Sequence, residues 1–260
     1  MTSIVDSVGR LRTSLAIGRA AALFALGFAF ATFAYGEDLN VLSTGAVKGP
    51  VNGLVADYQK KTGNTVKIEF GTAGQVEKKL AASAKPDLLI TTATRLAALP
   101  GASKDRVRPL GTVRIGVAKA SDAPKPDLES VEGFRASLLQ ARTVAYGNPS
   151  GGATTGVHFA HVVDSLGLAH DLADKRILAD DGFDVVQRVV SGEAELGIAP
   201  VSEILLIAPQ TYVGPLPEAL QLATTYSVWL VDPKNTRAQG LVDALTSEEA
   251  RAKFAAAGFE

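Results

Sequence analysis

Residues 40–63 read NVLSTGAVKGPVNGLVADYQKKTG, and the order of elements in this stretch decides the fold class. Residues 40–43 predict a short strand, and residues 47–62 predict a helix that ends at Gly63. Two further strands and two further helices repeat the order, at residues 65–70, 76–83, 87–91 and 94–99. This alternation predicts a parallel sheet with right-handed crossovers.

A second alternating set of elements follows a proline-rich connector at residues 123–126. Its strands and helices are predicted at residues 131–139, 143–146, 154–166, 176–178, 183–191, 195–199 and 202–207. A strand at residues 112–118 and an apolar stretch at residues 220–231 would carry the chain between the two sets. Terminal helices are predicted at residues 236–245 and 248–256, with Ser247 as the cap of the second. Asp180 or Asp181 is predicted to cap the helix at residues 183–191.

The expected fold is therefore α/β with two lobes, each a mostly parallel sheet flanked by helices. The two crossings between the lobes would act as hinge strands beside a cleft. Lobe 1 is expected to comprise residues 37–113 and 224–260, and lobe 2 residues 114–223.

The N-terminal residues 1–36 have the pattern of a signal peptide. Arg10, Arg12 and Arg19 precede an apolar run at residues 20–34, which is short for a membrane span. Ala34-Tyr35-Gly36 fits a cleavage site, so cleavage is expected near Gly36 and export to the periplasm follows. The alternative is an uncleaved N-terminal anchor.

Composition excludes several function classes. The 260-residue chain has a formal net charge of −1 and no cysteine. Disulfides, thiolate catalysis and cysteine metal sites are therefore excluded. No basic run is present, so nucleic acid is not an expected partner. The His158 and His161 pair is a weak metal signal, and we expect neither a metal nor a cofactor.

Three clusters of glycine and hydroxyl residues each lie between a predicted strand and a predicted helix, at residues 43–46, 71–74 and 147–156. A strand-to-helix turn leaves the first N–H groups of the helix unpaired, and the helix dipole favours negative charge there. Glycine lets a ligand approach the backbone, and Ser or Thr adds a neutral donor. The three turns predict a cleft for a small anion that is held mostly by neutral donors.

Four segments give the chain a family resemblance: residues 56–63, 86–90, 191–198 and 254–259. The most specific reads SGEAELGI, from Ser191 to Ile198. With these segments the chain resembles the molybdate-binding-protein-like family of periplasmic solute-binding proteins. The resemblance implies the class II periplasmic-binding fold, with a ligand bound between two α/β lobes.

The resemblance also implies ligand contacts, because the family binds molybdate through serine hydroxyls, backbone N–H groups and a tyrosine. In this chain the positions of those serines are occupied by Ala46, Ala73 and Gly74. The loss of the serine hydroxyls favours another small anion, such as a carboxylate. Tyr226 matches the tyrosine. The expected ligand-binding residues are Ser43, Thr44, Lys48, Thr72, Ala73, Gly74, Thr154, Thr155, Gly156, Ala199 and Tyr226.

Two main functions remain open, and the first has a variant, a sensory or orphan binding protein that has no permease. The first is a monomeric solute-binding protein that captures a small oxyanion or organic carboxylate and delivers it to an ABC permease. The second is an isomerase of the aconitate isomerase type, since such enzymes share the family fold. That reaction is an allylic proton shift, for which His158, Tyr226 and Glu203 are the candidate acid and base groups.

Overall fold

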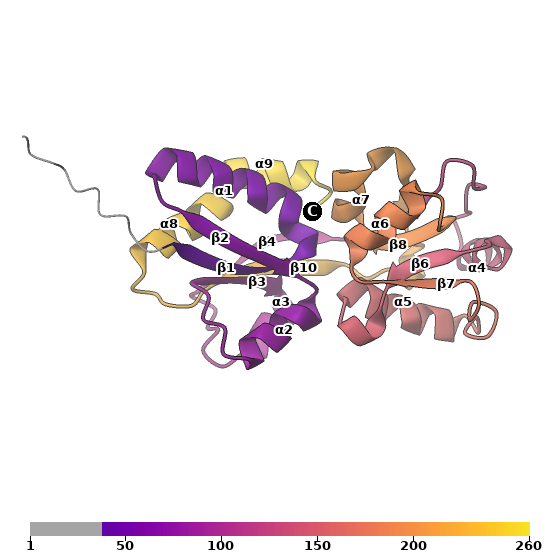
Figure 1. Cartoon of the computed structure of the whole chain (residues 1–260), viewed down its shortest axis with the longest axis horizontal. Coiled ribbons are helices and arrows are strands. Elements are labelled where there is room, and N and C mark those ends of the chain that lie inside the picture. The colour runs from indigo at the N-terminus through magenta and orange to yellow at the C-terminus, as the bar shows by residue number, and fades with distance from the viewer. Residues whose placement is uncertain (1–37) are drawn as a thin grey trace, which may run out of the picture. The chain divides into compact units, whose positions relative to one another are not determined.

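The first of two sheets holds five strands in the order β2–β1–β3–β10–β4, in a computed structural model that describes residues 38–260 (Figure 1). Its strands are β1 (Leu39–Thr44), β2 (Val66–Gly71), β3 (Leu88–Thr92), β4 (Val107–Val113) and β10 (Thr224–Leu230). β1 pairs in parallel with β2 and β3, whereas β10 runs antiparallel to both of its neighbours. The expected signal peptide lies outside the described residues.

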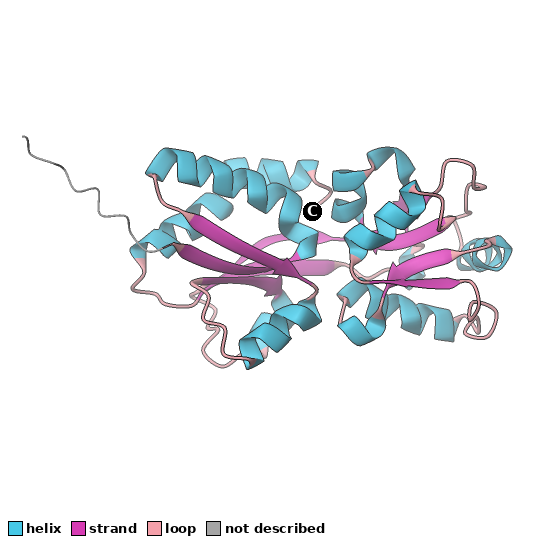
Figure 2. Ribbon diagram, viewed as in Figure 1, coloured by secondary structure: helices cyan, strands magenta, loops and turns pink. Residues whose placement is uncertain are grey.

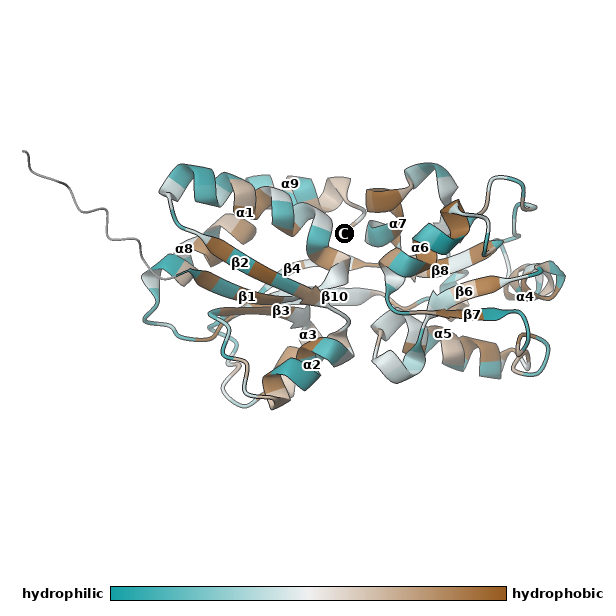
Figure 3. Cartoon of the chain, in the orientation of Figure 1, coloured by the Kyte–Doolittle hydropathy of each residue, from teal (hydrophilic) through white to brown (hydrophobic). Residues whose placement is uncertain are grey.

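Helices cover both faces of this sheet, because alternate strand residues point to opposite faces. On one face Val41 and Ile90 pack in a core with α1 (Lys48–Thr62), α8 (Thr236–Leu245) and α9 (Glu248–Ala256). On the other face Leu42 and Leu89 pack with α2 (Ala73–Ala81) and α3 (Ala93–Ala97). Figure 2 shows the resulting helix–sheet–helix layers, and Figure 3 shows the apolar colour along β1 and β2.

The second sheet repeats this plan, with five strands in the order β7–β6–β8–β5–β9. Its strands are β5 (Ile115–Lys119), β6 (Val144–Gly147), β7 (Arg176–Ala179), β8 (Leu196–Pro200) and β9 (Tyr212–Pro215). β6 pairs in parallel with β7 and β8, and β5 runs antiparallel to its neighbours. One face packs on α4 (Val131–Gln140) and α5 (Thr154–Ser165), and the other on α6 (Gly182–Val190) and α7 (Val201–Ile207).

Two segments carry the chain between the sheets. β4 and β5 are separated by Arg114 alone, and residues 216–223 connect β9 to β10 through a short 3₁₀ turn, η4 (Glu218–Leu220). The Arg114 guanidinium forms an ion pair with the Glu218 carboxylate, so the two crossings are tied to each other.

The prediction of one strand at residues 112–118 is wrong, because the extended chain there is two strands in different sheets. β4 pairs with β10, and after Arg114 β5 pairs with β8 and β9. A change of pairing partner leaves no trace in hydropathy. β9 also escaped prediction, since Gly214 and Pro215 read as turn residues.

Several local predictions are confirmed. α1 ends at Gly63 in the left-handed conformation (φ 73°), and Asp181 and Ser247 cap α6 and α9 with their side chains. Among residues 38–260, no helix is both long and apolar enough to cross a membrane.

Candidate functional site

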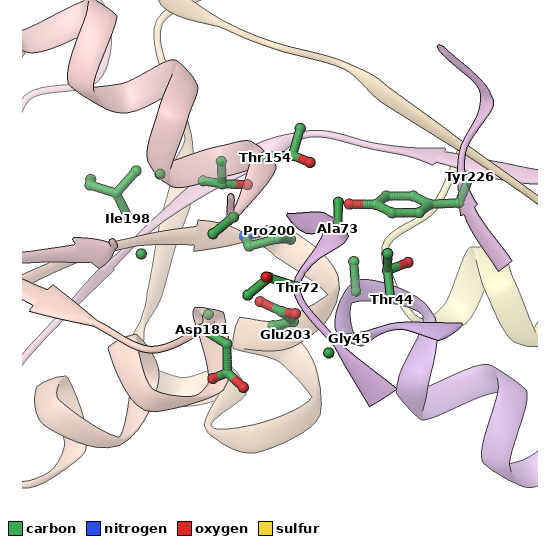
Figure 4. A pocket seen from close by; sticks show the side chains of 17 residues that line it. Thr44, Gly45, Thr72, Ala73, Thr154, Asp181, Ile198, Pro200, Glu203 and Tyr226 are labelled. Atoms are coloured by element: carbon green, nitrogen blue, oxygen red, sulfur yellow. The ribbon is translucent and has the colours of Figure 1, made fainter. Parts of the chain in front are cut away.

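A pocket lies between the two sheets, where the carboxyl ends of β1, β2, β6 and β8 meet (Figure 4). Its volume is about 50 Å³. The residues that line it are Thr44, Gly45, Ala46, Gly71, Thr72, Ala73, Gly147, Ala153, Thr154, Thr155, Gly156, Asp181, Gly182, Ile198, Pro200, Glu203 and Tyr226. All three glycine and hydroxyl clusters singled out in the sequence contribute to this lining.

Four helical N-termini reach the pocket. They belong to the 3₁₀ turn η1 (Gly45–Val47), which leads into α1, and to α2, α5 and α6. Thr72 and Asp181 cap α2 and α6, but no side chain caps η1 or α5. The first N–H groups of η1 and α5 are therefore without a side-chain partner at the wall of the pocket. Such groups favour an anion.

The start of α5 is fitted closely against β6. A Cβ at Gly156 would overlap the carbonyl of Gly147, so only glycine allows this approach. The approach places Thr154, Thr155 and Gly156 in the lining, where the sequence predicted them.

Thr44 lines the pocket, and its hydroxyl is buried. The residue is 3% exposed, and its Oγ1 has no hydrogen-bond partner among residues 38–260. Because an unpartnered buried hydroxyl costs free energy, this atom indicates a place for a ligand acceptor. Ser43 is also buried, but its Oγ donates to the Thr44 carbonyl at 3.1 Å and it lies outside the lining.

Thr72 links the two sides of the pocket. Its hydroxyl accepts the Gln75 N–H and donates to the Gly151 carbonyl at 2.7 Å. Gly74 lies just outside the lining, and its N–H donates to the Gly152 carbonyl at 3.1 Å. Since the hydroxyl hydrogen of Thr72 is engaged by Gly151, a bond to a ligand would require that partner to be exchanged.

Two carboxyl groups, Glu203 of α7 and Asp181, lie in the same part of the pocket (Figure 4). Glu203 is 5% exposed, and no hydrogen bond joins its carboxyl to another described residue. Burial, together with the charge of Asp181, raises the pKa of Glu203 to about 8 against the opposing effect of Lys48. Asp181 uses its own carboxylate to accept the Asp184 N–H at 2.9 Å.

Tyr226 of β10 directs its hydroxyl into the pocket (Figure 4). Its ring packs edge-on against Phe259, with centroids 6.3 Å apart. Burial raises the pKa of the Tyr226 phenol, and the neighbouring Glu203 raises it further. The phenol is therefore a neutral donor at physiological pH.

Lys48 lies outside the pocket lining. Its Nζ is 4.8 Å from the Phe183 ring centroid and 5.7 Å from that of Phe70, so the ammonium is placed between aromatic rings from both halves of the molecule. The expected role of Lys48 as a direct anchor would require the ammonium to leave these rings.

His158 and Ala199 also lie outside the lining. His158 Nε2 donates to the Leu220 carbonyl at 2.9 Å, which ties α5 to the second crossing, so a proton-transfer role would require this bond to break. Ala199 is fully buried, and its neighbours Ile198 and Pro200 line the pocket instead.

Asp181 and Gly182 are lining residues that sequence reasoning missed. The sequence identified Asp181 only as a possible helix cap, and nothing local shows that the α6 N-terminus faces the end of β1. Gly182 admits the Glu203 carboxyl, because a Cβ there would overlap Oε2 of Glu203.

Comparison with known proteins supports this architecture. An aconitate isomerase from a Pseudomonas species is 27% identical over 226 residues, which cover 82% of this chain and 83% of that protein. The Azotobacter vinelandii periplasmic molybdate-binding protein superposes with a TM-score of 0.69 at 20% identity, covering 85% of this chain and 98% of that chain. The tungstate ABC transporter from Geobacter sulfurreducens gives a TM-score of 0.62 at 15% identity, with coverages of 85% and 98%.

The identities to these solved structures are low, so they show the fold alone. The family model described as bacterial extracellular solute-binding protein matches residues 39–260. This match spans both sheets and the pocket, and it confirms the family resemblance seen in the sequence. The chain therefore belongs to the bacterial extracellular solute-binding protein family.

Proposed function

We propose that this protein captures a small anion, an oxyanion or an organic carboxylate, in the pocket between its two sheets. The observation that carries the proposal is the unpartnered Thr44 hydroxyl beside two uncapped helical N-termini. These groups donate hydrogen bonds and have no acceptor among residues 38–260. An anion in the pocket would satisfy them together.

The residues that line the pocket favour recognition of the anion by uncharged donors. None of the described residues that line the pocket is Lys, Arg or His. Binding would therefore depend on hydroxyl groups, backbone N–H groups and helix dipoles in a site with little water, where such donors act strongly. This is the mode of binding that the sequence predicted.

Contacts across the pocket support a cleft that closes on its ligand. Thr72 and Gly74 bond to Gly151 and Gly152, and Ser202 Oγ of α7 donates to the Ala46 carbonyl at 2.8 Å. These bonds join the two halves on both sides of the pocket. With Arg114 between β4 and β5, a small rotation at the crossings would open the site.

The size of the pocket favours a compact anion. Its 50 Å³ is several times the roughly 10–15 Å³ that one water molecule needs. Molybdate and tungstate, named for two structural relatives, are of this size, whereas an aconitate would require the halves to separate further. We extend the proposal to a periplasmic, monomeric protein that delivers its anion to an ABC permease.

The proposal is tested by thermal unfolding of the purified protein with molybdate, tungstate and trans-aconitate. We expect one of these anions to raise Tm in a concentration-dependent way, because a ligand that binds only the folded state stabilises it. The same Tm with and without every anion would contradict the proposal.

A second function, isomerisation of an unsaturated carboxylate, is favoured by Glu203. Burial raises the pKa of this carboxyl to about 8, so it can take and return a proton near neutral pH. In an allylic shift a base removes a proton from a methylene carbon, the double bond moves by one position, and the proton returns at the other end. The curated relative is an aconitate isomerase.

Turnover distinguishes the two functions. The protein is incubated with trans-aconitate, and cis-aconitate is followed by chromatography. Formation of cis-aconitate that is lost in Glu203→Gln or Tyr226→Phe would support the isomerase. Stabilisation by an anion without any conversion would leave the binding function alone.

A further inference from the structure

We propose that Glu203 is itself a ligand-contacting group and meets the bound anion as a neutral carboxylic acid, donating its proton to an anion oxygen. The inference rests on the proposed anion-binding function and deepens it. It adds a donor that the family resemblance does not supply.

Burial and contacts place the carboxyl at the anion. Glu203 lines the pocket, is 5% exposed, and lacks a hydrogen-bond partner among residues 38–260. Its Oε2 lies against Gly182 at the start of α6, and a Cβ at Gly45 would come within 3.0 Å of its Oε1. The carboxyl therefore lies between the N-termini of η1 and α6, one from each half, and no group among residues 38–260 shares its proton.

The two helical N-termini favour a carboxylate, but burial and the charge of Asp181 raise the pKa of Glu203 and favour its neutral form. Asp181, which caps α6, and Tyr226 of β10 lie near the carboxyl, and Lys48 of α1 is the cation that acts on it. No ion pair joins Lys48 to Glu203 within the described chain, since the ammonium lies over Phe183. A bound anion would add a further negative charge beside Asp181, and a carboxyl close to like charges keeps its proton.

A neutral carboxyl changes what the pocket can select. An ionised Glu203 would accept a hydrogen bond and would repel a fully ionised anion. The neutral acid donates one instead, so the pocket prefers an anion with free oxygen acceptors and no acidic hydrogen of its own. Above the pKa of Glu203, binding such an anion must be accompanied by uptake of one proton from solution.

The test is calorimetric titration of the full chain with molybdate, tungstate and trans-aconitate at about pH 7 and about pH 9, where these anions do not change their own ionisation. For an anion that binds, Kd should rise about tenfold between the two pH values, because the proton must be supplied at the higher pH. Repeating the titration in buffers of different ionisation enthalpy gives the number of protons taken up for each anion bound. Near pH 9 the wild type should take up close to one proton for each anion.

Two variants complete the design. Glu203→Gln keeps a donor but cannot titrate, so its Kd should change less than about twofold across the same range. Glu132→Gln, an exposed position on α4 outside the pocket, should keep the pH dependence of the wild type. If Glu203→Gln fails to fold, the number of protons that the wild type takes up on binding still tests the role of Glu203.

The outcomes separate the two proposals. Binding with the same Kd at both pH values and no proton uptake would overturn the role of Glu203 and leave anion binding intact. No binding of any of the three anions at either pH would overturn the proposed function, and this inference with it.

Discussion

The Thr72 hydroxyl donates a 2.7 Å hydrogen bond to the Gly151 carbonyl. This bond joins the start of α2, which packs on the first sheet, to the turn before α5, which packs on the second sheet. The same hydroxyl accepts the Gln75 N–H and so caps α2. One side chain therefore stabilises a helix and holds the two sides of the pocket together.

Thr72→Val removes the hydroxyl and keeps the shape of the side chain. We expect the free energy of unfolding to fall by about 1 kcal/mol, because the cap of α2 is lost. Anion affinity should fall by about three- to tenfold, because the bond to Gly151 no longer holds the pocket closed. Urea unfolding and calorimetric titration measure the two effects. Thr72→Ser is the control, and an equal loss in that variant would contradict the role of the hydroxyl.

Gly74→Ala tests the closed arrangement by steric means. A Cβ at Gly74 would lie 2.8 Å from the Gly151 oxygen and from the Gly152 Cα, so backbone must move. We expect the halves to separate, with at least a roughly tenfold loss of anion affinity. Small-angle scattering should report a larger radius of gyration.

Gly53→Ala is the matched control for this substitution. Nothing lies within 4 Å of a Cβ at Gly53, which is an exposed position within α1. This variant should gain about 0.5–1 kcal/mol of stability and bind as the wild type does. If Gly74→Ala bound equally well, the contact with Gly151 would be irrelevant to the site.

Thr44→Val removes the unpartnered hydroxyl of the pocket. Affinity for a bound anion should fall by about 1–2 kcal/mol. The free energy of unfolding should stay the same or rise, because the Thr44 hydroxyl has no hydrogen-bond partner among residues 38–260. Thr91→Val makes the same change at another buried, unpartnered hydroxyl that does not line the pocket. Reduced binding in both variants would show that the effect is not local to Thr44.

Stability should depend on pH through Glu203. Its pKa is raised from 4.5 to about 8 by burial, so between these values the folded chain holds a proton that the unfolded chain releases. The stabilisation is complete below about pH 4.5 and is lost as pH rises to about 8, at about 1.4 kcal/mol per pH unit. Glu203→Gln lacks this dependence. Urea unfolding of the wild type and of this variant between about pH 4.5 and about pH 8 tests the prediction. It would be refuted if the free energy of unfolding changed with pH in the same way in both proteins.

Much of the fold was predictable, because each element has a local signal. The strand before Thr44, the helix that ends at Gly63 and the caps at Asp181 and Ser247 all follow from apolar period and terminal residues. The division at Arg114 was not predictable, since the residues on both sides are equally suited to a strand. Only pairing with β10 or β8 distinguishes them.

The candidate site was predictable where backbone chemistry defines it. Thr44, Thr72 and Thr154 are in strand-to-helix turns, and the turns meet in the structure. Long side chains behaved differently, because Lys48 and His158 find partners that lie far away in the sequence, at Phe183 and Leu220. Tertiary packing decides such contacts, and no spacing in the chain encodes them.

The most direct test of the account is a crystal structure with whichever anion of the panel raises Tm most. We expect the anion in the pocket, with an oxygen within hydrogen-bond distance of Thr44 Oγ1 and another at the N–H groups that begin α5. An anion that binds elsewhere, with the Thr44 hydroxyl still unpartnered, would contradict it.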